Sequence, residues 1–296
     1  MKTAIATIVL AITAINSVFA DEITDGTRKT EAKTPAMIQA LKIIQRDSFY
    51  SDRAAAIDPS DLPVNEDEAV KKMLEAVGDL NGKYVEEDFL AFKKEHIKAT
   101  TVKENGYAIA VIELKQFSRG SAEKFEKILR EKLTKKISGL ILDLRDNSGG
   151  YLDETVLIAS QFIGKNKLIT TIKNGKGKKD TLFSLNEKNK DFELPMAIIV
   201  NRRSASASEI LSSALQHHKI ATIVGEPTYG KTHIQRKYDI NGKTLSLTTE
   251  RWRKPGASTN DGTVIPDAII TEEGRKNILL EAAKKIVLYK IDKTGR

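Results

Sequence analysis

The segment 224–232, VGEPTYGKT, contains a lysine within the pattern G-x-x-x-x-G-K-[ST], which typically cradles the phosphates of a nucleotide. That function requires a helix directly after the lysine, because the free N–H groups at a helix N-terminus hold the anion. After Lys231 the chain instead alternates apolar and polar residues around Asn241-Gly242, which predicts a β-hairpin. Pro227 also removes one backbone donor from the loop. We therefore expect no nucleotide binding, and Lys231 is available for other chemistry.

A group of serines provides the second candidate, in the segment 201–210, NRRSASASEI, which follows an apolar run. A serine at such a strand-to-helix junction lies at the carboxyl edge of a parallel sheet, where open α/β folds bind ligands. The helix dipole there favours a developing negative charge. However, Ser206 and Glu209 also fit the capping box S-x-x-E, so Ser206 is either a helix cap or a nucleophile. The local sequence does not choose among Ser204, Ser206 and Ser208.

A pair of glycines ends another apolar strand in the segment 142–150, LDLRDNSGG. Gly149 and Gly150 allow the backbone to approach a substrate closely, and exposed N–H groups at such a turn can bind an oxyanion. An ordinary glycine turn has the same residues. Together the three features supply a hydroxyl, a lysine and backbone donors at the ends of predicted strands. This is the minimum set for acyl transfer by a Ser–Lys pair.

The composition excludes several other kinds of site. The chain has 296 residues, 40% hydrophobic and 30% charged, as expected for one large globular domain or one domain with a smaller appendage. Because it has no cysteine, disulfides, thiolate metal sites and cysteine nucleophiles are excluded. The four histidines lack metal-ligand spacing, so we expect no metal and no cofactor. The net charge is +8, but the lysines are scattered and aromatic residues make up 6%, so nucleic-acid binding is not expected.

The first twenty residues, MKTAIATIVLAITAINSVFA, are typical of a secretory signal peptide. Lys2 is the positive n-region, 4–14 is an apolar core too short for the ~18 residues of a membrane span, and 18–20 is a small-residue cleavage site. We therefore predict a periplasmic or secreted protein without a stable membrane span after cleavage. Residues 21–36 have the polar composition of a linker.

The elements that position these residues follow from the hydrophobic periodicity. Residues 37–101 contain helical stripes, including one expected over 86–96, and predict a small helical unit after the linker. Apolar runs then alternate with helices, which predicts βαβ units, a mostly parallel sheet and an α/β fold. Strands are expected at 107–114, 139–144, 196–200 and 220–224, and helices around 125–133, 155–163, 206–218 and 277–291. Asn174-Gly175 and Asn241-Gly242 predict inserted β-hairpins.

The motifs, taken together, resemble those of the C-terminal processing proteases, also called tail-specific proteases. The matching segments, in the family's order, are 143–150 (DLRDNSGG), 204–210 (SASASEI), 224–231 (VGEPTYGK) with Gln235, and the P-x-G-x-S…G…P-D stretch of 255–267. The similarity covers roughly residues 105–270. It implies a ClpP/crotonase-like catalytic core, which we place at 102–296, acting on protein or peptide substrates.

The resemblance also implies a role for each site residue. Ser206 is the nucleophile, Lys231 the general base, and Gln235 orients the lysine. The oxyanion is held by the backbone N–H of Ala207 together with that of Gly149 or Gly150. A lysine has an ordinary pKa of about 10.4, so the base must be buried, because burial disfavours the charged amine.

The chain departs from the family pattern in its N-terminal part. Many members carry a PDZ domain that captures the substrate's C-terminal tail. Here the segment 78–84, GDLNGKY, looks like the family's D-P-x-S-x-Y-L segment, and between Glu95 and Gly106 there is no room for a domain of ~80–100 residues. We therefore expect no PDZ domain, and a partner acting as an adaptor would be one replacement. Arg203 and Thr232 also stand where the family often has glycine.

Three functions are compatible with this pattern. The first is a secreted serine endopeptidase that cleaves near C-terminal or unfolded segments. The second is a non-catalytic, peptide-binding or adaptor member of the same fold. The third is a Ser-His-Asp hydrolase, which would need an acid beside His217, His218 or His233. His217 and His218 are expected about 17 Å along the helix from Ser206, which disfavours both.

Overall fold

The computed structural model describes residues 33–86, 96–134, 136–186, 192–259, 261–271 and 277–294. Within it, residues 34–296 form one compact unit. The signal peptide and most of the linker predicted from the sequence lie outside the described residues, as does nearly all of the helix expected over 86–96. Among the helices that are described, none combines the length and apolar composition needed to cross a lipid bilayer.

The N-terminal part of this unit is helical, as predicted. Its elements are α1 (Pro35–Asp47), α2 (Ser51–Ala54), the 3₁₀ turn η1 (Pro59–Asp61) and α3 (Glu66–Val77). The helix α1 begins before the predicted end of the linker, because the Thr34 side chain accepts the N–H of Met37 (3.2 Å). Asn65 caps α3 by accepting the N–H of Glu68 (3.0 Å), and Gly78, with φ 74°, ends it.

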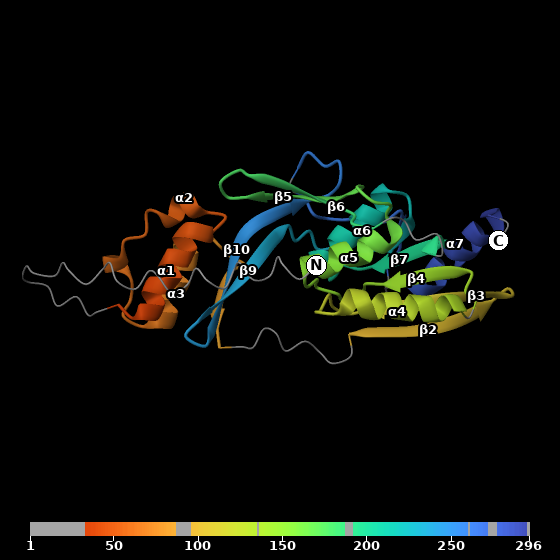
Figure 1. The fold of residues 1–296 in the computed structure, drawn as a ribbon, viewed down its shortest axis with the longest axis horizontal. Coiled ribbons are helices and arrows are strands. Elements are labelled where there is room, and N and C mark those ends of the chain that lie inside the picture. The colour runs from red at the N-terminus through yellow and green to blue at the C-terminus, as the bar shows by residue number, and fades with distance from the viewer. Residues whose placement is uncertain are drawn as a thin grey trace, which may run out of the picture. The chain divides into compact units, whose positions relative to one another are not determined.

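A six-stranded sheet forms the centre of the α/β part (Figure 1). Its strands, in spatial order, are β11 (Ala268–Ile269), β8 (Ala221–Gly225), β7 (Met196–Val200), β4 (Gly139–Asp143), β3 (Tyr107–Leu114) and β2 (Ile97–Glu104). All neighbours are parallel except β2 and β3, so the mostly parallel sheet expected from the sequence is confirmed.

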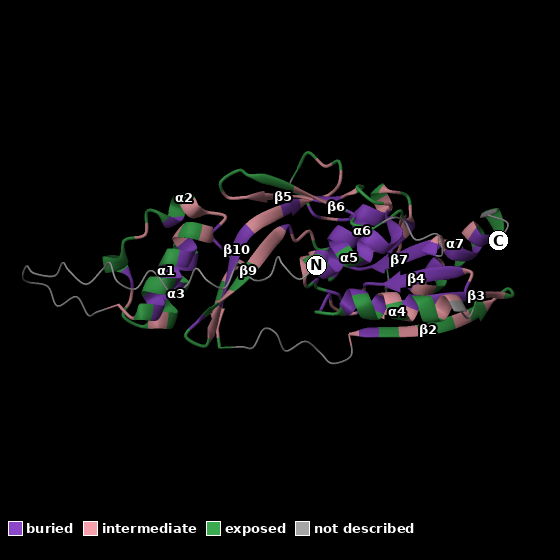
Figure 2. Ribbon diagram, in the orientation of Figure 1, coloured by how far each residue is buried: buried purple, intermediate pink, exposed green. Residues whose placement is uncertain are grey.

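Helices cover both faces of this sheet. The elements on one face are α4 (Ser121–Thr134), α5 (Leu152–Phe162) and α6 (Ala207–His217), and α7 (Ile278–Thr294) lies on the other. The residues of β4 and β7 are buried throughout, as Figure 2 shows, which explains why these strands are continuous apolar runs in the sequence.

A second, antiparallel sheet is built from the predicted hairpins. Its strands are β1 (Lys83–Val85), β5 (Leu168–Asn174), β6 (Lys179–Phe183), β9 (His233–Ile240) and β10 (Lys243–Arg253). The order is β1-β10-β5-β6, with β9 also paired to β10. Asn241 and Gly242 turn the β9–β10 hairpin with φ values of 54° and 81°. One face of this sheet, called the inner face below, packs Leu245 and Leu247 against α1 and α3 and Trp252 against the main core. The opposite face is called the outer face.

The strand β2 was not predicted. Of its eight residues only Ile97 is buried, so the hydrophobic alternation is weak. Asn105 and Gly106 form the turn that joins it to β3, with φ values of 50° and 80°. The same Asn-Gly pair predicted the β9–β10 hairpin correctly. The short strands β1 and β11 were missed as well.

Candidate active site

Ser206 lies at the turn between β7 and α6, in a backbone conformation that residues other than glycine rarely adopt. Its φ and ψ are 55° and −112°. Such a conformation costs of order 1–3 kcal/mol and persists only when its surroundings enforce it. Here the Glu209 carboxylate accepts the Ser206 N–H (2.7 Å), and the N–H of Ala205 donates to the carbonyl of Asn147 (3.0 Å). A sharp turn of this kind between strand and helix presents a serine side chain outward.

The three alternating serines have different environments. Ser204 and Ser208 are fully buried, and their hydroxyls donate to the carbonyls of Leu144 and Asn147, each at 2.8 Å. Ser206 is the half-exposed member of the three. Among the three serines, only Ser206 therefore combines solvent access with a position at the helix N-terminus.

Gly149 packs directly against the Ser206 turn. A Cβ atom at this position would lie 2.9 Å from Ser206 Cβ and 3.0 Å from the Ala207 nitrogen, and φ is 108°, so only glycine fits. The N–H of Gly149 donates to Asn147 Oδ1 (2.8 Å). In the part of the chain that is described, the N–H groups of Ala207 and Gly150 have no acceptor. These two N–H groups, rather than that of Gly149, are therefore available to an oxyanion.

Lys231 is half-buried in the loop between β8 and β9. Its Nζ donates to Gln235 Oε1 (3.3 Å), and Gln235 Nε2 donates to the Asn81 carbonyl (2.5 Å), which turns the amide oxygen toward the lysine. Burial lowers the pKa of Lys231, and the nearby charge of Lys83 lowers it further, against the opposing effects of Asp79 and Glu209. This environment favours the neutral amine that a general base requires.

Glu209 joins the serine turn to the lysine loop. Its side chain is fully buried and accepts four hydrogen bonds, from the N–H of Ser206 (2.7 Å), Thr228 Oγ1 (2.6 Å), and the N–H groups of Gly230 (2.6 Å) and Lys231 (2.9 Å). The Ser206 and Lys231 N–H groups share one carboxylate oxygen, Oε2. Burial raises the pKa of this carboxyl, and the hydrogen bonds oppose the rise. The sequence identified Glu209 only as half of a capping box.

The structure also accounts for the phosphate-binding pattern around Lys231. The strand β9 follows the lysine, as predicted, where a nucleotide site would need a helix. The N–H groups of Gly230 and Lys231 donate to the Glu209 carboxylate. A protein carboxylate therefore holds the donors that a phosphate would need.

Within the described residues, the histidines do not form a Ser-His-Asp arrangement with Ser206. His217 and His218 lie at the far end of α6, and His218 Nε2 is 2.8 Å from the Leu168 carbonyl. His233 lies opposite Arg251 on β10, and within the described residues no acid is hydrogen-bonded to it. Burial lowers the pKa of His233, and Arg251 lowers it further. In the same part of the chain, metal-binding side chains do not gather in groups of three or more.

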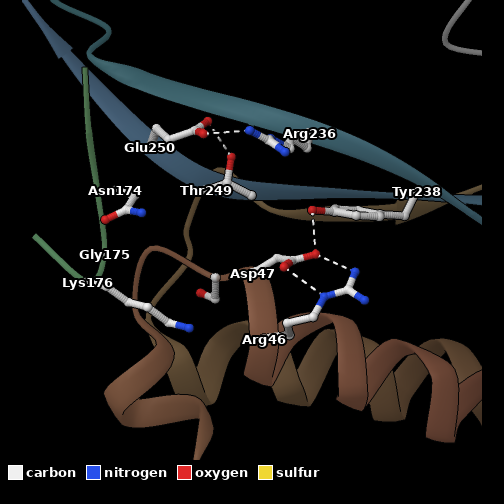
Figure 3. A pocket seen from close by; sticks show the side chains of 10 residues that line it. Arg46, Asp47, Asn174, Gly175, Lys176, Arg236, Tyr238, Thr249 and Glu250 are labelled. Carbon is white, nitrogen blue, oxygen red and sulfur yellow. Dashed lines mark hydrogen bonds and ion pairs between the residues drawn. The ribbon is translucent and has the colours of Figure 1, made fainter. Parts of the chain in front are cut away.

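A polar hollow of about 260 Å³ lies between the end of α1 and the inner face of the antiparallel sheet (Figure 3). Except for Lys176, its charged groups pair with one another. Asp47 accepts from Arg46 (2.8 and 2.6 Å) and from the Tyr238 hydroxyl (3.0 Å), and Arg236 pairs with Glu250 (2.8 Å). The hydrogen bond from Tyr238 to Asp47 connects α1 to the sheet, and the Arg236–Glu250 pair joins β9 to β10, so we assign the hollow a structural role.

Substituting Asp47 with asparagine is expected to lower the free energy of unfolding by about 0.5–1 kcal/mol at pH 7, since the pair is partly exposed. The hydrogen bond from Arg46 lowers the pKa of Asp47 below its ordinary value. The stabilisation is therefore present above the unfolded pKa near 3.9 and is lost as the pH falls through the lower folded pKa. Urea unfolding of both proteins at pH 7 and at pH 2.5 measures it, and a difference that persists at pH 2.5 would contradict the assignment.

Comparison with known proteins places this geometry in a family. The sequence profile of peptidase family S41 matches residues 108–270, which contain Gly149, Ser206, Lys231 and Gln235. The chain belongs to peptidase family S41. The carboxy-terminal processing protease CtpB of Bacillus subtilis (strain 168) is 34% identical over 165 residues, which are 55% of this chain and 34% of that relative. The chain thus spans about a third of the length of this curated S41 relative.

Solved structures share the fold. The photosystem II D1 C-terminal processing protease superposes with a TM-score of 0.65 at 18% identity, over 85% of this chain and 96% of that one. A lipoprotein from Streptococcus agalactiae gives a TM-score of 0.67 at 16% identity, over 91% and 99% of the two chains. Both likenesses therefore extend over most of the chains compared.

Proposed function

We propose that this chain is a serine endopeptidase in which Ser206 is the nucleophile and Lys231 the general base. The observation that carries the proposal is the position of the Glu209 carboxylate. One of its oxygens, Oε2, accepts from both the Ser206 and the Lys231 N–H groups and so links the two residues. Membership of peptidase family S41 and the carboxy-terminal processing relatives support it. With residues 1–20 removed as a signal peptide, the enzyme would act in the periplasm or outside the cell.

The reaction that this arrangement supports proceeds through an acyl-enzyme. The neutral Lys231 amine takes the Ser206 hydroxyl proton while Oγ attacks the peptide carbonyl carbon. The N–H groups of Ala207 and Gly150 stabilise the resulting oxyanion. Protonated Lys231 then gives its proton to the leaving amine as the C–N bond breaks. Water, deprotonated by the same lysine, attacks the ester and regenerates Ser206. Gln235 keeps the amine in position throughout.

The rate should depend on pH through the neutral fraction of Lys231. Its pKa is lowered by burial and by Lys83, so kcat/KM should rise with a midpoint below the ordinary 10.4 of lysine. In a Lys83→Gln variant the midpoint should move to higher pH, because the nearby cation no longer disfavours the protonated amine, and kcat/KM at pH 7 should fall about two- to threefold. A pH–rate profile with no shift in the variant would show that Lys83 does not tune the base.

The direct test of the function is mass spectrometry of an unfolded polypeptide incubated with the purified protein. The wild-type chain should produce discrete fragments that are missing with Ser206→Ala. Ser213→Ala, on the same helix, is the matched control, since its hydroxyl bonds the Ile210 carbonyl within α6. Identical fragments from wild type and Ser206→Ala would refute the proposal. Binding of the polypeptide without cleavage by the wild type would favour the non-catalytic alternative.

A further inference from the structure

The outer face of the antiparallel sheet carries a concentration of positive charge beside the proposed active site. Directly paired residues in a sheet place their side chains on the same face. On this face one row contains Lys83, Ser246 and Lys237, the next Thr248 and Gln235, and a third Lys179, Lys173, Arg251 and His233. The catalytic candidate Gln235 therefore lies between two cationic rows.

A β-bulge makes the third row possible. The register between β9 and β10 shifts between Thr248 and Glu250, so one extra residue of β10 lies between two paired positions. This shift places Arg251 on the same face as Thr248 instead of on the inner face. His233, which pairs with Arg251, follows Lys231 by two residues, so the third row begins next to the lysine.

The cations of this face differ in their partners, and Arg251 donates to the Tyr50 hydroxyl (2.9 Å). Lys83, Lys173 and Lys179 make no ion pair with a described acid. Of the acids nearby, Asp79 is held by the N–H and the hydroxyl of Thr248 (both 2.8 Å), and Asp239 lies at the far end of β9. The inner face differs, because there Arg236 is paired with Glu250. Three lysines without an ion pair to a described acid, Lys83, Lys173 and Lys179, therefore lie on the face that carries Gln235.

We propose that the outer face binds an acidic segment of the polypeptide substrate and so selects bonds that lie close to glutamate or aspartate residues. The proposal rests on the peptidase function proposed above and names its substrate class. Strands lie about 4.8 Å apart, so the third row extends roughly 14 Å from β9 to β6, and an extended peptide covers that distance with about four residues. An acidic segment of about four residues would therefore cover the row.

Charge complementarity favours a peptide over other anions because the face is continuous with Lys231 and Gln235, whose chemistry acts on a peptide bond. An acidic segment on these rows would be attracted from solution and held in register with Ser206. Since the side chains are partly solvated, the attraction should weaken as salt screens it.

The test uses two pairs of fluorogenic peptides that share the residues around the cleaved bond. In one pair, three glutamates or three glutamines lie on the N-terminal side of that bond, and in the other pair they lie on its C-terminal side. For the wild type, kcat/KM for the glutamate peptide of one pair should exceed that for its glutamine partner about tenfold at low salt, and the ratio should fall at 0.5 M NaCl. In Lys83→Gln/Lys173→Gln/Lys179→Gln the ratio should fall to about one. The ratio cancels any general effect of Lys83 on the base.

The matched control is Lys127→Gln/Lys285→Gln, which removes two exposed lysines from α4 and α7 and should keep the wild-type ratio. A ratio near one in the wild type, or a ratio unaltered in the triple variant, would overturn the proposal.

Binding to Ser206→Ala separates this proposal from the proposed function. Fluorescence anisotropy should show the labelled glutamate peptide binding about tenfold more tightly than the glutamine peptide, with the difference lost when the three lysines are also replaced. That result supports the acidic-segment site even if the wild type cleaves nothing. Single-stranded DNA that binds more tightly than the glutamate peptide through the same lysines would overturn it.

Discussion

Replacing Lys231 with methionine is expected to lower kcat/KM for peptide cleavage about a thousandfold while the protein stays folded. Methionine keeps most of the side chain's bulk and removes the amine that accepts the Ser206 proton. A positioned general base contributes about 10²–10⁴ to the rate, and residues that act as one catalytic unit lose most of their effect together. Steady-state kinetics with a peptide that the wild type cleaves measures the loss.

The same substitution should not destabilise the protein at pH 7. The pKa of Lys231 is lower in the folded state than in the unfolded chain. At a pH below this folded pKa the amine is protonated in both states, and its burial then costs the folded protein free energy that the unfolded chain does not lose. The variant is therefore as stable as the wild type or more so at pH 7, and this advantage disappears above the unfolded pKa near 10.4. Lys285→Met, on the exposed side of α7, is the control. A Lys231→Met enzyme that retained a tenth of the rate would exclude lysine as the base.

Replacing Glu209 with alanine is expected to affect both stability and activity. The substitution leaves four donors in the fold without their acceptor, at Ser206, Thr228, Gly230 and Lys231. We expect the free energy of unfolding to fall by about 3–5 kcal/mol, which lowers the melting temperature by roughly 10 °C in a domain of this size. Activity should fall at least a hundredfold at temperatures where the variant is still folded, because the strained turn of Ser206 loses its support.

Glu209→Gln provides the sharper comparison. The amide keeps one acceptor oxygen but turns an NH₂ group toward two of the four donors, so we expect an intermediate loss of stability with a clear loss of kcat. Glu123→Gln, at an exposed position of α4, is the matched control. Calorimetry and kinetics on the same preparations separate the two effects. Full activity in Glu209→Gln would mean that the carboxylate does not position the site.

The sequence predicts the buried parts of this fold well because burial leaves a pattern. The strands β4 and β7 are buried along their whole length and appear as apolar runs, and α1 and α3 appear as periodic stripes. The edge strand β2 has one buried residue and leaves almost no pattern, although Asn105-Gly106 signals its hairpin. Edge elements are predicted by their turns rather than by their hydrophobicity.

The candidate site could be predicted in part for a similar reason. Ser206, Lys231 and Gln235 lie in recognisable motifs at strand ends. Their supports come from distant parts of the chain: Gln235 donates to the carbonyl of Asn81, 154 residues away, and Glu209 reaches the lysine loop. The sequence could not choose between Gly149 and Gly150 either, because the choice depends on which N–H the Asn147 side chain occupies.

The carboxylate of Glu209, which the serine turn and the lysine loop share, has a consequence for local unfolding. The N–H groups of Ser206, Gly230 and Lys231 all donate to the same buried carboxylate, so we expect each to exchange with solvent when that carboxylate leaves its place. The serine turn and the lysine loop then open as one cooperative unit, although they are more than twenty residues apart in the chain. Amide hydrogen exchange should report a single opening free energy for the three, and the nucleophile should lose its base in the same event.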